Sequence, residues 1–567
     1  MSDQISLEDI ASLAKRRGFI YQGSDIYGGL AGTWDYGPLG VALKRNIMNL
    51  WWKMFVDSRD DMYGVDAAIL MNQKVWQASG HVETFADPLI TCENCNSRFR
   101  VDQFIDDLEY KDLRHELLEF INDARLGALN SDHESVDDDV EVLTRYLSNE
   151  PNEKLSKVVK DSLGKISDRA ELIAKVTDWA NGAARYVGVF PKIFLTLHDQ
   201  KCPTCGKVQW SDATQFNMMF KTFVGSVSTT IESEQYNGLA GELTLGDSEF
   251  STKVVIPYSK QLDSAVFYNK KGTSYLRPET AQGIFTNFKN VVDSFYPDVP
   301  FGLAQQGKAF RNEISPRDFV FRSREFEQME VEYFVHPEEW EVAFESWRKA
   351  VHEWCKALGL PEDKVHELEV PEHDRAHYSK RTIDFEFDFP HGRHELLGLA
   401  YRTDFDLGNI QRVSGKSMEY RPKDGGKPFV PHVIEPSFGV ERAIMAVLTS
   451  AYTEDEMNGE KRIFLKLPKD LAPIKAAVSP LLKNKPELVA KAKEVYDMLK
   501  KELGAVMWDD NGNIGKRYRR QDEIGTPVCI TIDFDTLEDG TVTVRNRDTA
   551  AQERIAIDQL LAHLLLG

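Results

Sequence analysis

Residues 310–334, FRNEISPRDFVFRSREFEQMEVEYF, constrain the fold more than any other stretch of this sequence. Two extended segments flank a turn that contains Pro316 and Asp318, and this arrangement predicts a β-hairpin. In the second segment Gln328 and Glu330 alternate with apolar residues, which is the period of a strand with one polar face. We therefore expect an antiparallel sheet around this hairpin, with polar side chains on one side.

The same hairpin brings arginines together. Arg311 ends the first segment and Arg322 begins the second. Arginines on adjacent strands do not neutralise each other, so the pair predicts a bound anion, and the planar guanidinium suits phosphate oxygens. Phe326 can then stack on a purine ring, and Glu313 can accept a hydrogen bond from an exocyclic amine. The alternative is a solvated hairpin whose charges form surface salt bridges.

A second constellation is EPSFGVERAIMA, residues 435–446. The pattern predicts a strand that passes through a Pro/Gly turn into a helix with apolar residues such as Val440 and Ile444 toward the core. Arg442 lies in the first turn of that helix, where the helix dipole and the backbone amides favour anions. The alternative is an ordinary helix start with an exposed arginine.

Length and charge bound the remaining possibilities. A chain of 567 residues is too long for one core and predicts two to four domains. No apolar run is long enough for a membrane span, and the N-terminus lacks the apolar core of a signal peptide, so a cytoplasmic protein is expected. The net charge of −21 argues against a nucleic-acid partner, but the acidic residues concentrate in 101–150 and a basic cluster lies at 516–520.

Periodicity divides the chain into segments. VALKRNIMNLWWKMF, Val41–Phe55, predicts a long helix with a broad apolar face. Residues 101–199 form an acidic, mostly helical insertion, and residues 224–272 a second insertion with strand-like runs at Lys253–Tyr258 and Ala265–Asn269. A strand-rich core extends from Ser274 to about Tyr452. Beyond it we expect a small α/β domain with a helix over Pro486–Leu503, strands over Val528–Ile532 and Thr541–Arg545, and a final helix over Gln552–Leu566.

Four of the six cysteines form two CxxC pairs, Cys92/Cys95 and Cys202/Cys205. Two such pairs predict a closed, tetrahedral and therefore structural zinc site. The 106 residues between Cys95 and Cys202 fit this site if the acidic helical segment is inserted between its halves. The alternative is four unrelated buried cysteines.

FRNE, the following RSREF and the later GVER resemble motifs 2 and 3 of the class II aminoacyl-tRNA synthetases. GTWDYGPLGVALKRNIMNLWWKMF, near residues 33–60, resembles motif 1, whose long helix serves dimerisation. The segments SDIYGGLAGTWDYGPLG, DAAILMNQKVWQASGHVETFADP, LRPETAQGIFTNFKNV and EPSFGVER narrow the resemblance to the dimeric glycyl-tRNA synthetases. It covers about residues 7–100, 200–222, 274–450 and the C-terminal domain.

This resemblance implies an α+β fold. Residues 1–100 and 200–455 would form the antiparallel-sheet catalytic core, with motif 2 at 310–334 and motif 3 at 435–450. Residues 101–199 and 224–272 would be insertions, the first tied to the zinc site. Residues 462–567 would form an α/β anticodon-binding domain.

The implied activity is attachment of glycine to the 3′ end of tRNA-Gly by a homodimer. Glycine and ATP would form glycyl-adenylate, and the glycyl group would pass to the tRNA with release of AMP and diphosphate. Arg311 would be the catalytic residue at the α-phosphate, and Glu395 together with Glu435 would supply carboxylates to Mg²⁺. The residues implied around ATP are Arg311, Asn312, Glu313, Phe321, Arg322, Ser323, Arg324, Glu325, Phe326, Glu395, Leu396, Gly439, Val440, Glu441 and Arg442.

Glycine has no side chain to grip, so its site must bind the ammonium group tightly and leave no room beyond Cα. The residues implied for this site are Arg100, Glu279, Phe326, Glu327, Gln328, Met329, Glu330, Glu435, Pro436, Ser437, Phe438 and Gly439. The basic cluster Lys516, Arg517, Tyr518, Arg519 and Arg520 is expected to contact tRNA, although a solvated basic turn is the alternative. Two other functions stay open: a class II synthetase for another amino acid, and a synthetase-like tRNA-binding protein without activity.

Overall fold

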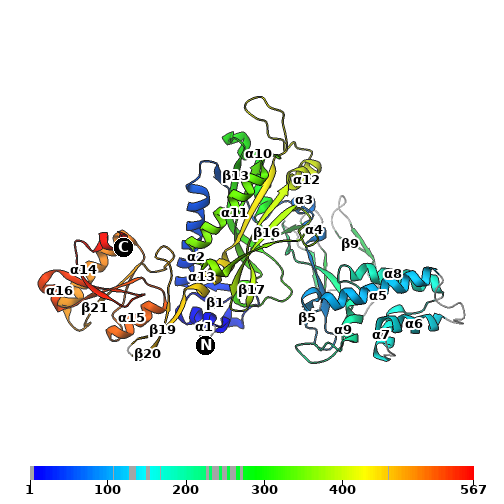
Figure 1. Ribbon diagram of the computed structural model, residues 1–567, viewed down its shortest axis with the longest axis horizontal. Helices are drawn as coiled ribbons and strands as arrows, with labels where there is room; N and C mark the ends of the chain where they lie inside the picture. Colours follow the sequence, from blue (N-terminus) through cyan, green and yellow to red (C-terminus); the bar gives the residue numbers. More distant parts are fainter. Residues whose placement is uncertain are drawn as a thin grey trace.

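The structure is a computed structural model that describes residues 5–105, 107–126, 136–148, 153–166, 168–224, 229–232, 242–245, 252–255, 264–267, 273–457 and 459–566. Figure 1 shows three bodies side by side along the longest axis of the molecule. A sheet-centred body lies in the middle, the C-terminal body lies at one end, and a group of helices from the first half of the chain lies at the other.

A seven-stranded sheet forms the central body, in the order β15-β16-β17-β18-β14-β13-β3. All neighbouring strands are antiparallel except β3 and β13, which are parallel. Strands β13 and β14 are the predicted hairpin, so the expectation of an antiparallel sheet around it is confirmed. The strands are β3 (Met62–Gly64), β13 (Phe301–Phe310), β14 (Glu325–Val335), β15 (Val365–Glu369), β16 (Arg381–Phe389), β17 (Gly392–Thr403) and β18 (His432–Gly439).

Alternation along β14 separates the two faces of this sheet. Met329, Val331 and Tyr333 pack in the main apolar core, which residues of α2, α11 and α13 complete. On the opposite face Phe334 packs against α10 and α12 in a second cluster. The helices around the sheet are α1 (Leu7–Arg17), α2 (Pro38–Trp52, continued by a π-helical turn, η2, Lys53–Asp57), α10 (Ala281–Phe295), α11 (Trp340–Ala357), α12 (Phe405–Ser414) and α13 (Val440–Ala451).

Strand β18 leads directly into α13, which corrects the expected Pro/Gly turn. Pro436 lies within the strand and pairs with Leu399 of β17. On its other side the register of β18 with β14 skips residues 435 and 436. A proline without an N–H group fits such a gap in the ladder, so the strand continues to Gly439.

The helical insertion leaves and re-enters the central body through one small sheet. Strands β4 (Ala86–Thr91), β5 (Arg98–Arg100) and β6 (Thr214–Asn217) form a three-stranded sheet, with β4 in the middle. We call this sheet the neck. Beyond it the helices of residues 101–199, where the sequence predicted a mostly helical segment, enclose an apolar core of their own. They are α5 (Asp107–Leu126), α6 (Val136–Ser148), α7 (Glu153–Leu163), α8 (Arg169–Ala183) and α9 (Phe190–Leu197).

The predicted strand-like runs of the second insertion coincide with short strands. Residues 256–258 and 268–269 of these runs lie outside the described residues. The strands from this part of the chain are β7 (Lys221–Phe223), β8 (Thr229–Glu232), β9 (Glu242–Leu245), β10 (Thr252–Val255), β11 (Ser264–Phe267) and β12 (Thr273–Tyr275).

The C-terminal body has a five-stranded sheet in the order β22-β21-β23-β24-β25, packed against α14. The predicted final helix is wrong in its first half. Residues Gln552–Ala556 alternate in character and pair as β25 with β24, so the helix α17 starts only at Leu560. The elements are β21 (Ala476–Pro480), α14 (Pro486–Leu503), β22 (Val506–Trp508), α15 (Ile514–Glu523), β23 (Val528–Ile532), α16 (Phe534–Asp539), β24 (Thr541–Asn546), β25 (Gln552–Ala556) and α17 (Leu560–Leu566).

A hairpin of β19 (Tyr452–Met457) and β20 (Glu460–Leu465) connects the central and C-terminal bodies. Arg462 of β20 is buried and pairs with Asp522 of α15, which also pairs with buried Arg545 of β24. A buried ion network therefore fixes α15 where the two bodies meet. Within the described part of the chain, no helix combines the length and the apolar character that a membrane span requires.

Candidate active site

A cavity of about 430 Å³ opens on the polar face of the central sheet. Strands β14, β17 and β18 supply its floor, and residues of the loop between β13 and β14 supply part of its walls. Residues that the sequence singled out, from seven separate segments, meet here. They are Arg100, Glu279, Arg311, Glu313, Phe321, Arg322, Ser323, Phe326, Gln328, Glu330, Glu395, Leu396, Glu435, Ser437, Gly439, Glu441 and Arg442.

Carboxylates dominate one side of the cavity, which we call the acidic wall: Glu279, Glu330 and Glu435. Each has a different partner. Glu330 accepts hydrogen bonds from Ser437 Oγ at 2.6 Å and from the backbone N–H of Thr280 at 3.1 Å. Glu435 pairs with Arg402 at 2.5 Å. These contacts fix the carboxylates in place while they face the cavity.

Behind the acidic wall lie two more carboxylic acids, Glu332 and Asp406, and one guanidinium, that of Arg402. Asp406 makes a bidentate pair with Arg402 at 2.7 and 2.9 Å. Neither carboxyl oxygen of Glu332, which is fully buried, has a hydrogen-bond partner among the described residues. Burial and the neighbouring Glu435 raise the pKa of Glu332 well above its ordinary value, which favours the uncharged form of this side chain.

Arginines dominate the other side of the cavity. Arg442, in the first turn of α13, pairs with Glu395 at 2.9 Å and lies over the Phe321 ring at 4.6 Å. This pairing is the largest of the effects that lower the pKa of Glu395. Arg311 donates from Nε to the carbonyl of Pro278 at 3.1 Å, and its guanidinium lies 5.3 Å from the Phe326 ring. Such a wall attracts an anion of high charge.

Two further residues match the requirements of a purine. Glu313 is buried, and its Oε2 atom has no hydrogen-bond partner within the described chain. An unpaired buried acceptor is costly unless a ligand donates to it. Phe326 presents its ring to the same cavity. An aromatic face beside an unpaired acceptor can recognise a base that carries an amino group.

Eight of the implied residues do not line the cavity, chiefly because strand alternation turns them away. Glu325 and Glu327 point to the other side of β14, where Lys308 pairs with Glu325 at 2.9 Å and Lys44 with Glu327 at 3.1 Å. Arg324 donates to the backbone carbonyls of Ala31 and Glu313. The other five are the buried core residues Met329, Phe438 and Val440, the strand residue Pro436, and Asn312, whose N–H bonds to Met218.

The structure adds lining residues that the sequence analysis missed. The segment from Val370 to Tyr378, between β15 and β16, covers part of the cavity, and no motif in it pointed there. Asp384 of β16 also lines the cavity, and burial, together with Glu395 and Glu386, raises its pKa to about 7. The acidic alternation of β16 was the available signal for Asp384.

The two carboxylates expected to share Mg²⁺ lie far apart, which corrects that prediction. Both are on neighbouring strands, but Glu435 is the register partner of Ala400 rather than of Glu395. Five residues of strand separate Glu395 from that position, or about 16 Å at the usual rise per residue. One ion therefore cannot contact both carboxylates.

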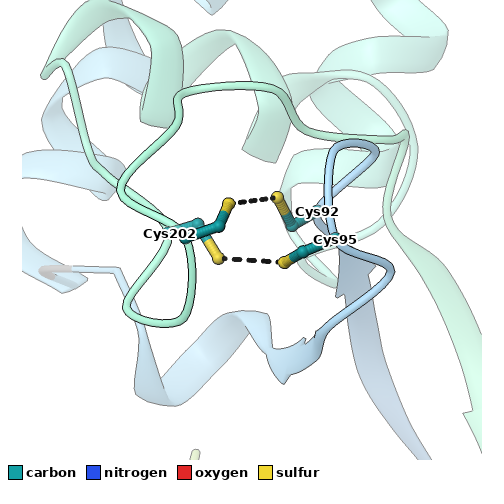
Figure 2. Close-up of side chains that lie close together, drawn as sticks. Cys92, Cys95 and Cys202 are labelled. Atoms are coloured by element: carbon teal, nitrogen blue, oxygen red, sulfur yellow. Dashed lines mark hydrogen bonds between the residues drawn. The ribbon is translucent and has the colours of Figure 1, made fainter.

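The four CxxC cysteines come together at the neck, outside the cavity (Figure 2). The Sγ atoms of Cys92 and Cys205 are 3.6 Å apart, and those of Cys95 and Cys202 are 3.7 Å apart. All four atoms lie within 4.8 Å of one another. Zinc–sulfur bonds of about 2.3 Å in a tetrahedron require sulfur atoms about 3.8 Å apart, so the cluster has the dimensions of a Cys₄ zinc site.

The basic cluster of α15 is largely tied up within the protein. Arg517 is buried and donates to the carbonyls of residues 480, 510 and 512, so the expectation that it contacts tRNA is wrong. Arg520 pairs with Asp509 at 2.6 Å, and Tyr518 bonds to Thr531 with its ring beneath Arg545. Arg519 donates to the carbonyl of Lys461, and only Lys516 in this cluster is fully exposed.

Comparisons with known proteins agree with this geometry. Residues 267–451 match the family model "tRNA synthetase class II core domain (G, H, P, S and T)", and residues 475–565 match the model "Anticodon binding domain". A solved prolyl-tRNA synthetase from Giardia lamblia, in complex with prolyl-adenylate, is similar in fold at 12% sequence identity and a TM-score of 0.54. That similarity covers 98% of this chain and 77% of the Giardia chain.

Curated relatives are much closer in sequence. The glycine–tRNA ligase of Clostridium kluyveri is 40% identical over 563 residues, and the match covers 98% of this chain and 97% of the relative. The glycine–tRNA ligase of Thermus thermophilus is 40% identical over 582 residues with the same coverage. That of Lachnospira eligens is 42% identical over 562 residues and covers 98% of both chains.

Proposed function

This chain belongs to the glycine–tRNA ligases, class II enzymes that charge tRNA with glycine, and we propose that the cavity on its central sheet is where glycine reacts with ATP. The observation that carries this proposal is the division of the cavity into an acidic wall and a wall of arginines. The first suits the ammonium group of glycine, and the second suits the phosphates of ATP.

Glycine would lie with its ammonium group against Glu279, Glu330 and Glu435. The excess of carboxylates over buried cations on this wall makes a cationic ligand favourable. Arg100, held by Asp87 at 2.9 Å and Asp102 at 2.6 Å, lines the cavity and would attract the glycine carboxylate. Larger amino acids would be excluded by contact beyond Cα.

ATP would lie with adenine between Glu313 and Phe326, and with its phosphates toward Arg311, Arg322 and Arg442. A glycine carboxylate oxygen attacks the α-phosphorus, the bond from that phosphorus to the bridging oxygen breaks, and diphosphate leaves. The chain needs no nucleophile of its own for this step. Arg311 would stabilise the charge that develops on the α-phosphate oxygens.

For Mg²⁺ we propose Glu395 with Asp384. Gly398 is the register partner of Asp384, and a Cβ atom on Gly398 would lie 3.9 Å from Asp384 Oδ1 and 3.8 Å from Glu395 Oε1. The missing side chain thus leaves a space between two carboxylates, and carboxylate oxygens suit this cation. When bound, Mg²⁺ neutralises charge on the phosphates and holds them in place.

The Cys₄ cluster at the neck supports a structural zinc ion. Four cysteines leave no open coordination position, so zinc would supply folding energy rather than catalysis. The second insertion, 224–272, carries no proposed role.

We propose a division of labour along the chain. Residues 1–100 and 200–455 would form adenylate, residues 101–199 would be an accessory insertion, and residues 462–567 would bind the anticodon end of tRNA-Gly. The match of residues 475–565 to the anticodon-binding model supports the last assignment. Since charging of tRNA serves translation, we place the enzyme in the cytoplasm.

An exposed apolar loop supports a homodimer. Ile26 is 88% exposed and Tyr27 is 87% exposed, immediately before the motif 1 segment. Side chains of this kind are commonly covered by a partner. Sedimentation equilibrium of the wild type should give a dimer, and the double variant Ile26→Asp/Tyr27→Asp should shift it toward monomer.

ATP–pyrophosphate exchange tests the proposed site. Glycine should support exchange, whereas alanine, serine, proline and threonine should not. Glu279→Gln should raise the KM for glycine far more than the KM for ATP, because its carboxylate belongs to the acidic wall and not to the residues assigned to adenine. Exchange that is unaffected by both Glu279→Gln and Arg311→Ala would show that the reaction takes place elsewhere.

A further inference from the structure

A histidine outside the cavity controls one of the carboxylates inside it. His81 begins the short helix α4 (His81–Thr84), which follows α3 (Gln73–Ala78) after a tight turn at Ser79 and Gly80. Gly80 has φ of 85°, a conformation that favours glycine and reverses the chain here. The turn directs the imidazole of His81 toward the back of the acidic wall.

His81 lies between a serine and Glu279, and all three side chains are buried. Its Nδ1 atom lies 2.8 Å from Ser79 Oγ, and its Nε2 atom lies 3.3 Å from Glu279 Oε1. Ser79, His81 and Glu279 are 5%, 8% and 8% exposed. Because a carboxylate only accepts hydrogen bonds, Nε2 must carry the proton that points to Glu279. Serine can donate to Nδ1 or accept from it, so this arrangement holds for the neutral and the charged ring.

Aromatic neighbours leave the imidazole little freedom. The rings of Trp76 and Phe85 each lie 5.4 Å from it, centroid to centroid, on α3 and directly after α4. Trp76 is fully buried. Locked packing around a hydrogen-bonded histidine is the arrangement that fixes a partner's orientation in other polar sites.

His81 and Glu279 differ in their access to the cavity. Glu279 lines it, whereas His81 does not. Two side chains approach the Glu279 carboxylate, that of His81 at 3.3 Å and that of Gln282 at 3.5 Å, and both meet Oε1. This leaves Oε2 for a ligand in the cavity. Glu279 differs in this from Glu330, which is held by Ser437 and Thr280, and from Glu435, which is held by Arg402.

We propose that His81 is a positioning residue for glycine, which holds Glu279 by one carboxylate oxygen so that the other meets the ammonium group. The proposal rests on the assignment of the acidic wall to glycine. It predicts a defect mainly in glycine binding, because the side chains that contact Glu279, those of His81 and Gln282, make no hydrogen bond with Glu313 and no ring contact with Phe326 within the described residues.

Electrostatics agree with this role. Burial would raise the pKa of Glu279, but His81, Arg402 and Arg311 outweigh burial and lower that pKa to about 2. Without His81 the pKa of Glu279 should rise, because one of the groups that stabilise its charged form is lost. The other titratable or charged groups that face Glu279 are Arg311 after β13, Glu330 on β14, Arg402 on β17, Glu435 on β18, and the nearby Tyr378 and His377.

Three substitutions at one position test the proposal in the full-length enzyme. The amide nitrogen of glutamine reaches about as far as imidazole Nε2, whereas that of asparagine reaches only about as far as Nδ1. His81→Phe and His81→Asn should therefore raise the KM for glycine in ATP–pyrophosphate exchange ~10- to 100-fold, the size expected for a hydrogen bond to a charged group. His81→Gln should stay within about threefold of the wild type, and the KM for ATP should hardly change in all three.

Rescue by the conservative variant separates positioning from a merely structural role. In His81→Asn the kcat of exchange and the thermal unfolding should stay near the wild-type values while the KM for glycine rises, and His81→Gln should restore that KM. An unchanged KM for glycine in His81→Asn would overturn the proposal, as would equal losses in the Gln and Asn variants. If His81→Phe fails to fold, the Gln and Asn pair decides. Failure here with Glu279→Gln still defective for glycine would leave the proposed function intact.

Discussion

The acidic wall of the cavity and the basic helix α15 are both clusters of like charges in the structure, but the partners of these charges differ. Behind and along the acidic wall, five carboxyl groups surround the single guanidinium of Arg402, and Glu332 has no hydrogen-bond partner among the described residues. On α15 the arginines at 517, 519 and 520 all donate to carbonyls or carboxylates of this same chain.

The difference shows that internal pairing, rather than the density of charge, separates a ligand site from a structural network. A buried cluster with more carboxyl groups than cations is costly, so it persists where a cationic ligand completes it. A buried charge with several partners is already complete and contributes to the fold. Five substitutions test this distinction, taken from the largest expected effect to the smallest.

Cys202→Ser should have the largest effect, because we assign the four cysteines of the Cys₄ cluster no role other than binding the metal ion. Loss of one thiolate should release one zinc ion per chain and lower the unfolding temperature of the neck and the helical insertion. Structural zinc contributes about 10–16 kcal/mol of binding free energy in small zinc domains. Elemental analysis and calorimetry measure both effects, and Cys355→Ser, at a buried thiol outside the cluster, should retain the metal. Wild-type protein purified without chelator and free of zinc would contradict the site.

Asp522→Ala breaks the completed network at its centre. Buried Arg545 then loses both of its hydrogen bonds to Asp522, which are 2.8 and 3.0 Å long. An uncompensated buried charge should reduce the free energy of unfolding by about 3–5 kcal/mol. Urea unfolding measures this loss, while glycine-dependent exchange below the transition should stay normal. Asp497→Ala, at an exposed pair with Lys493, is the matched control and should change stability very little.

Arg311→Ala should give the reverse result, with activity lost and stability kept. Its guanidinium faces the cavity, and removing one transition-state contact should cost about 3–4 kcal/mol, or two to three decades in the rate of exchange. Thermal unfolding should match the wild type. Arg393→Ala, at an exposed pair with Asp388, should leave exchange unchanged. Exchange within tenfold of wild type in Arg311→Ala would remove Arg311 from the mechanism.

Arg517→Ala should lower stability rather than tRNA affinity. Its loss leaves three backbone carbonyls near the C-terminal sheet without their donor, at a cost of about 1–3 kcal/mol. Denaturant titration and tRNA binding at equal folded concentration separate the two quantities. A uniform loss of tRNA affinity with unchanged stability would mean that Arg517 meets phosphate after all.

Lys516→Ala should have the smallest effect. The side chain is exposed, so stability should change by less than about 0.5 kcal/mol. If Lys516 neutralises one phosphate of tRNA, the slope of log affinity against log salt should flatten by about 0.7–0.9. An unchanged slope would exclude Lys516 from the tRNA surface.

The parts of the fold that could be predicted from the sequence are those with strong local patterns. Alternation along β14 and the helical period of Pro486–Leu503 gave elements close to those observed. The C-terminal strand β25 was missed because its alternating residues directly precede a helix and were counted as part of it. Pro436 was read as a turn because the gap in the ladder that accommodates it depends on the neighbouring strand.

The candidate site was predictable for residues in motifs and unpredictable where it depends on register or on distant partners. Alternation alone could have excluded Glu325 and Glu327 from the cavity, whereas the separation of Glu395 from Glu435 follows only from the pairing of β17 with β18. Whether the α15 arginines are free to bind a ligand depends on carbonyls from β21 and from the loop before α15, which accept their hydrogen bonds. No local pattern contains that information.

The neck has a consequence for how this protein tolerates change in length. Strands β4 and β6 pair side by side, and the cysteines that flank the insertion meet at the same place. For the central body, the 106 residues between Cys95 and Cys202 therefore act as a loop whose two ends are already held together. Closing an open loop costs about 0.6 kcal/mol more for each doubling of its length. When the ends of the loop are already held together at the neck, this entropic cost does not add to the free energy of folding of the sheet that holds the cavity. Segments can thus be gained or lost beyond the neck without altering the geometry in which glycine is activated.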